Sequence, residues 1–94
     1  MTVTPEAETE RRLAVRAAHE EQRQRLGVTH HRAWCRRDDA RAAYETALGA
    51  HLSDPDDPDL AEAVLAASTR LAAVEHVLAD VSRRLDRNRR VAVR

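Results

Sequence analysis

The sequence contains very little of what usually builds the core of a small globular domain. Its 94 residues include no Phe, no Ile, one Trp and one Tyr, whereas Ala occurs 18 times. Alanine favours helix strongly but buries little apolar area. Because a chain of this length can form only a thin core, we expect helices that approach closely or share a core with another chain.

Three further absences narrow the class of protein. A single Cys excludes an internal disulfide framework and suits a reducing compartment. No apolar run approaches the roughly 20 residues that span a bilayer. The N-terminal stretch MTVTPEAETERR is acidic and has no apolar segment typical of a signal peptide. We therefore expect a cytoplasmic protein without a membrane partner.

Lysine is also missing, so all 16 basic residues other than His are Arg, and they balance 16 acidic residues. A net charge of zero gives no global argument for binding nucleic acid. The distribution is uneven, however. Residues 53–80 carry seven acids and one Arg, whereas residues 81–94 carry six Arg and one Asp.

Two helix starts and one turn can be recognised. Thr4 is a predicted N-cap before Pro5, and Asp57 is a predicted N-cap before Pro58. Between the two helices, the stretch HLSDPDDPD contains two Pro and four Asp and cannot continue a helix, and Gly49 could begin the exit early. The predicted domain is therefore a helix over about 5–50, a turn over about 51–57, a helix over about 58–90 and a frayed C-terminal tail.

The second helix has a sustained heptad repeat, in which apolar residues follow steps of four and three. These positions are Leu60, Val64, Ala67, Leu71, Val74, Leu78, Val81 and Leu85. Further apolar residues, including Leu65 and Val77, widen the stripe beyond a two-stranded coiled coil. This helix needs more than one neighbour.

The first helix is less regular. From Leu26 onward, one side gathers Ala33, Ala40, Tyr44, Ala47 and Leu48, interrupted by His30 and Arg37. Residues 19–25 are polar throughout, and Gly27 lies where the apolar phase changes. We favour one long helix, bent or weakened near Gly27, over separate helices.

The predicted fold is therefore all-α: a long, coiled-coil-like antiparallel hairpin that dimerises into a four-helix bundle. With a turn near residue 55, facing residues have numbers that add to about 110, which predicts contact of Arg37 or Arg41 with Glu75. We expect a homodimer because one copy of the first helix offers too little apolar bulk to cover the second. The predicted interface residues are Trp34, Tyr44, Leu48, Leu65, Leu71, Val77 and Leu78.

The stretch HHRAWCRRDD holds the only Trp and the only Cys. On a helix, His31 and Cys35 are one turn apart, a spacing that can chelate a metal, and Asp38 could add a third ligand. Without a second Cys or a Gly-rich loop, we interpret this stretch as two ordinary faces of a helix, with Trp34 packing at the seam edge. We expect no cofactor, no metal and no catalysis.

The functional hypothesis is a protein–protein interaction or assembly module, an adaptor or regulatory protein that acts as a homo-oligomer. An alternative is a helical nucleic-acid-binding protein, in which the C-terminal Arg cluster contacts phosphates. That cluster consists of Arg83, Arg84, Arg87, Arg89 and Arg90. A third hypothesis is an ion-binding helical bundle that uses His31, Cys35 and Asp38.

Overall fold

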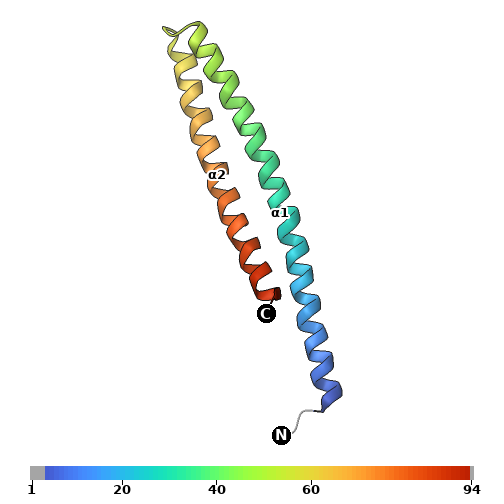
Figure 1. Cartoon of the computed structure of the whole chain (residues 1–94). Helices are drawn as coiled ribbons and strands as arrows, with labels where there is room; N and C mark the ends of the chain where they lie inside the picture. Colours follow the sequence, from blue (N-terminus) through green and yellow to red (C-terminus); the bar gives the residue numbers. More distant parts are fainter. Residues whose placement is uncertain (1–3, 94) are drawn as a thin grey trace.

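The computed structural model describes residues 4–93 as two long helices, α1 (Pro5–Ser53) and α2 (Pro58–Val93), packed as an antiparallel hairpin (Figure 1). The molecule is a rod with extents of 78 × 18 × 17 Å. Residues 4–93 contain no strand, so the predicted all-α hairpin is confirmed. Within the same range, neither helix has the length and apolar character needed to cross a membrane.

The start of α1 follows from its first residues. Thr4 has an extended backbone, and its hydroxyl accepts a hydrogen bond of 3.2 Å from the Ala7 amide. Pro5 occupies the first helical position, where its missing N–H costs nothing. Glu6 and Glu8 lie in the first turn, where negative charge favours the helix dipole. The predicted N-cap is confirmed.

The turn between the helices is shorter than predicted. α1 continues through Gly49 to Ser53, and neither glycine of the chain has a positive φ. The helix ends at Asp54, whose φ of −144° and ψ of 74° lie outside the helical region, because the residue before a proline is disfavoured in the α region. Asp57 then caps α2, with Oδ1 accepting a hydrogen bond of 2.9 Å from the Asp59 amide. Pro55, rather than Gly49, stops α1.

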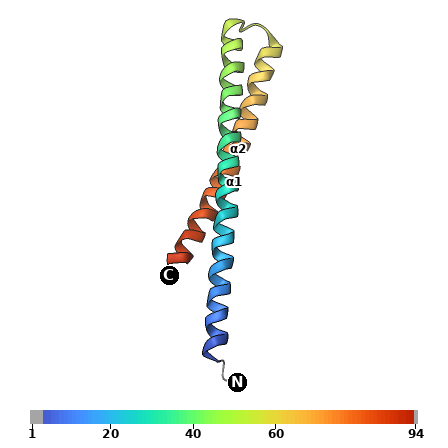
Figure 2. The same ribbon diagram turned by 90° about the vertical axis from the view of Figure 1, so that its right-hand side faces the viewer.

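α1 is a single helix of 49 residues that runs through Gly27 without a break. In the orthogonal view, α2 crosses α1 and lies on opposite sides of it at the turn and at the C-terminus (Figure 2). Because α1 has no break, the prediction of one continuous first helix is confirmed, and the bend or weak point near Gly27 stays a prediction.

The two helices meet along one line of residues, which we call the seam. On α2, the predicted heptad positions from Leu60 to Leu85 are half-buried or buried, and the seam continues to Asn88, which is 6% exposed. On α1, seam positions alternate between apolar and polar side chains. They are Leu26, His30, Ala33, Arg37, Ala40, Tyr44, Ala47 and His51.

Few apolar side chains are buried by this packing. Among the described residues, they are Ala33, Ala40, Val81 and Leu85. The alternation on α1 explains why, since the larger residues of α2 face Ala or polar groups instead of other large apolar side chains. The core of the hairpin is thin.

α2 continues beyond its predicted end, so residues 91–93 are helical instead of frayed, while Arg94 lies outside the described residues. Gln22 hydrogen-bonds to Asn88 near the end of α2. The N-terminal turns of α1, before about Ala17, therefore extend past the end of α2, as Figure 1 shows. We call this part of α1 the overhang.

Candidate functional site

In the part of the chain that the structure describes, polar side chains bridge the two helices at two places in the seam. His30 Nε2 and Ser82 Oγ are 3.1 Å apart, and Asn88 Nδ2 donates a hydrogen bond of 3.0 Å to Gln22 Oε1. Both pairs agree with facing residue numbers that add to about 110. Each contact joins one residue of α1 to one residue of α2 across the seam.

Arg37 lies in the seam but does not reach the predicted partner. Its side chain is 17% exposed, its guanidinium lies 4.2 Å from the centre of the Trp34 ring, and its Nε is 3.5 Å from Asp38 Oδ1. Among the described residues, no ion pair joins Glu75 to Arg37 or Arg41. The predicted contact of Arg37 or Arg41 with Glu75 is therefore not an ion pair. Stacking on Trp34, one turn earlier on α1, holds the Arg37 guanidinium on its own helix.

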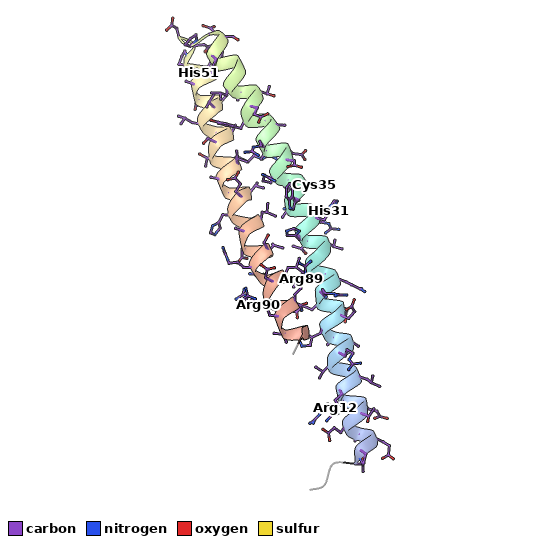
Figure 3. The ribbon with its side chains drawn as sticks, viewed as in Figure 1. Arg12, His31, Cys35, His51, Arg89 and Arg90 are labelled. Atoms are coloured by element: carbon purple, nitrogen blue, oxygen red, sulfur yellow. The ribbon has the colours of Figure 1, made fainter. Side chains whose placement is uncertain are left out.

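The His31, Cys35 and Asp38 side chains are all exposed on α1. His31 Nε2 and Cys35 Sγ are 3.7 Å apart, one helical turn from each other (Figure 3). The Asp38 carboxylate contacts Arg37 and does not join the His31–Cys35 pair. Across residues 4–93, no group of three or more His, Cys, Asp or Glu side chains is placed to hold a metal ion. The arrangement is a surface pair on a helix, and neither residue lines the pockets formed by other described residues in the N-terminal half of α1 and the C-terminal part of α2.

The predicted interface residues divide into two sets. Tyr44, Leu48, Leu71 and Leu78 are half-buried and lie at or beside the seam within one chain. The other three remain solvent-accessible, with exposures of 43% for Trp34, 70% for Leu65 and 50% for Val77. The second set presents the more exposed apolar surface to another molecule.

The C-terminal Arg cluster lies beside a second group of Arg residues that sequence reasoning missed. Figure 3 shows Arg89 and Arg90 near the end of α2, and Arg12 on the overhang. Arg83 and Arg84 are partly neutralised by Asp80, at 3.8 and 3.1 Å. For Arg87, Arg89 and Arg90, no carboxylate lies within ion-pairing distance among the described residues.

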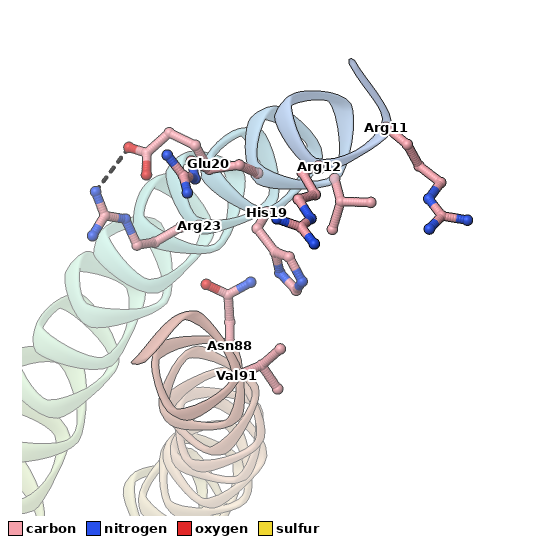
Figure 4. Close-up of a pocket in the computed structure, with 9 residues that line it drawn as sticks. Arg11, Arg12, His19, Glu20, Arg23, Asn88 and Val91 are labelled. Carbon is pink, nitrogen blue, oxygen red and sulfur yellow. Dashed lines mark hydrogen bonds and ion pairs between the residues drawn. The ribbon is translucent and has the colours of Figure 1, made fainter. Parts of the chain in front are cut away.

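A groove forms where α2 ends against α1, and we call it the open-end groove (Figure 4). Its main part has a volume of about 450 Å³, and an adjoining part has about 390 Å³. Two buried polar atoms there, His19 Nδ1 and Asn88 Oδ1, have no hydrogen-bond partner within the described chain. The residues lining the two parts are Arg11, Arg12, Val15, Arg16, His19, Glu20, Gln22, Arg23, Leu26, Arg84, Arg87, Asn88 and Val91.

The charge of this groove is strongly positive, since six Arg and one Glu line it. A sequence signal for it exists. Arg16, Arg23, His30, Arg37, Tyr44 and His51 follow one another at intervals of seven residues. Extending the α1 heptad upstream of Leu26 would have placed Arg16 and Arg23 on the seam side, facing the end of α2.

No protein-family model matches the chain, and neither a curated protein nor a solved structure matches it significantly.

Proposed function

We propose that this chain is a non-catalytic assembly module that acts as a homodimer, in which two hairpins pack into a four-helix bundle. The observation that carries the proposal is the thin core. Apart from two Ala, only Val81 and Leu85 among the described apolar side chains are buried within one hairpin.

The energetic argument concerns what a single hairpin leaves in water. The seam residues of α2 from Leu60 to Leu78 are only half-buried. Ordering the backbone costs about 1–2 kcal/mol per residue, and apolar burial must offset that cost. A lone hairpin of 18 × 17 Å cross-section buries few large side chains on any side. A second hairpin supplies the missing apolar contact.

Exposed apolar residues lie on both flanks of the seam, where such a contact can form. Leu65 and Val77 on α2 and Trp34 on α1 are all outside the seam and well exposed. Burying a Leu or Val side chain contributes about 1.5–3 kcal/mol. The surrounding positions of α2, such as Ala61, Ala72 and Ala79, are small, which allows helices to approach closely.

We assign no catalytic role to the chain. Cys35 and His31 both lie on an exposed helix surface, whereas nucleophilic catalysis needs a concave site around the nucleophile. The single exposed Cys also accords with a reducing, cytoplasmic location, which is part of this proposal.

Light scattering and sedimentation of the purified chain test the dimer. We expect twice the 10.6 kDa chain mass at micromolar concentration. Leu65→Glu should raise the dimer dissociation constant at least about tenfold, equal to about 1.4 kcal/mol. His76→Glu is the matched control, because His76 is the α2 position most remote from the seam. A cooperatively melting monomer of 10.6 kDa would refute the proposal.

A second candidate function is nucleic-acid binding at the open-end groove. The observation that favours it is the meeting of Arg84 and Arg87 with the Arg residues of α1. Phosphate contacts would make the affinity for any duplex fall steeply with salt. Fluorescence anisotropy with a labelled duplex tests this function, and Arg16→Glu/Arg87→Glu should then abolish binding. A dissociation constant weaker than the millimolar range at low salt would reject this function.

A further inference from the structure

The open-end groove holds positive charge that the chain itself does not neutralise. Arg12 and Arg23 pair with Glu8 and Glu20, at 2.9 and 2.8 Å. Arg11, Arg16 and Arg87 form no ion pair with any carboxylate in the described range. The groove therefore retains unpaired guanidinium groups from both helices.

The opposite end of the rod has the reverse charge. No Arg occurs between Arg41 and Arg70, while this stretch contains six acids. Five of them lie in or just after the turn, at Asp54, Asp56, Asp57, Asp59 and Glu62. Within residues 4–93, none of these five takes part in an ion pair, and all but Asp57 are exposed. We call this region the acidic turn.

One chain cannot bring these two charged regions together. They lie at the two ends of the hairpin, in a rod 78 Å long (Figure 1). Charges in physiological salt are screened over about 8 Å. Neutralisation therefore requires a second molecule.

We propose that the open-end groove binds the acidic turn of a second copy, so that the two hairpins of the dimer run antiparallel. This inference rests on the proposed homodimer and gives it a geometry. A two-fold axis across the rods places each acidic turn against the partner's groove, so both contacts form at once and the assembly closes.

The parallel arrangement is opposed by the same charges. It would place two acidic turns side by side and two sets of groove Arg residues side by side. Like charges brought together at an interface oppose association, whereas complementary ends fix the register and accelerate encounter. Exposed ion pairs are individually weak, and the two complete sets of charges act together to select the orientation.

The antiparallel arrangement also places apolar residues near the two-fold axis. If Asp56 of one copy lies at the level of Arg16 of the other, the midpoint falls near residue 36 of α1 and residue 74 of α2. Trp34 and Val77 lie close to this level and are 43% and 50% exposed. Their helical positions place them on opposite flanks of the seam. Either flank therefore offers an exposed apolar side chain at the centre of the dimer.

Charge reversal tests the proposal by sedimentation equilibrium. Arg16→Glu/Arg87→Glu reverses the groove, and Asp56→Arg/Glu62→Arg reverses the acidic turn without touching the Asp57 cap. We expect each double variant to raise the dimer dissociation constant at least about tenfold. Mixing the two in equal amounts should restore wild-type affinity within about threefold, because each reversed end meets its complement.

Two controls accompany these variants. Arg16→Lys/Arg87→Lys keeps the charge and should dimerise as the wild type does. Circular dichroism should show unchanged helix content for every variant, since the four substituted side chains are exposed. Raising the salt should weaken the wild-type dimer, and it should weaken the dimer of the mixed variants at least as much.

A spin label provides a second readout of orientation. Ala50 is exposed near the turn, so Ala50→Cys in a Cys35→Ser background places one label in each copy. In the antiparallel dimer the two labels should be about 40 Å apart, from about 28 residues of helix at 1.5 Å each. In a parallel dimer they would be closer than about 25 Å.

The outcomes separate the two proposals. A monomeric wild type overturns both the dimer and its geometry. A dimer that is unaffected by either reversal, or that brings the labels close together, overturns only the antiparallel arrangement. Open-ended growth of mass with concentration would indicate head-to-tail filaments and would overturn the closed antiparallel dimer. An effect of the groove reversal alone, together with duplex binding, would assign the groove to nucleic acid and also overturn the proposal.

Discussion

His30 of α1 and Ser82 of α2 are joined across the seam by a contact of 3.1 Å between Nε2 and Oγ. Both side chains are half-buried, and the contact links residues 52 positions apart in the chain. A histidine at this seam position replaces the apolar residue that a coiled coil would normally carry. The hairpin thus exchanges some apolar burial for a specific polar contact.

A double-mutant cycle with His30→Ala and Ser82→Ala should measure this contact. We expect a coupling energy of about 0.5–1.5 kcal/mol, the usual net value of an intramolecular hydrogen bond. Urea unfolding at a fixed chain concentration provides the free energies. Strict additivity of the two variants would show that the contact contributes nothing.

Replacing Asn88 by Leu should stabilise the hairpin. Asn88 is 6% exposed, and its Oδ1 has no hydrogen-bond partner within the described chain. Burial therefore removes this oxygen from water without a hydrogen bond to compensate. We expect Asn88→Leu to raise the free energy of unfolding by about 1 kcal/mol. The loss of the Gln22 contact costs little, because Gln22 is exposed. Gln22→Ala serves as the control, and a drop in stability for Asn88→Leu would contradict the argument.

Gly27→Ala and Gly49→Ala should each stabilise α1. Both glycines have helical backbones, and a Cβ built on either meets nothing within 4 Å. Alanine is favoured over glycine in a helix interior by about 1 kcal/mol. Thermal unfolding should therefore show a higher Tm for each variant. Ala43→Gly, at an exposed position of the same helix, should lower the Tm by a similar amount.

Asp57→Ala should destabilise α2 and Asp56→Ala should not. Only Asp57 places its carboxylate on a free backbone amide at the start of the helix, at 2.9 Å from the Asp59 nitrogen. Loss of an N-cap costs about 0.5–2 kcal/mol. Chemical denaturation of the two single variants makes the comparison, and equal stabilities would show that the cap is dispensable.

Local chemistry in the sequence determined where the helices begin and how α2 presents its apolar face. Thr4 before Pro5 and Asp57 before Pro58 cap their helices as predicted, because a cap depends on neighbouring residues only. The heptad from Leu60 to Leu85 likewise identified the seam of α2, since a period of 3.5 residues places all its members on one side.

The seam of α1 and the open-end groove were decided by tertiary structure. The sequence pattern placed His30 and Arg37 on the apolar side of α1, where they interrupt it. Packing against α2 decided that both are half-buried and that His30 contacts Ser82. Gln22 and Asn88 are 66 positions apart, and only the register of the hairpin brings the Arg residues around them together. The groove forms because α1 is longer than α2, and the side chains that line it come from both helices.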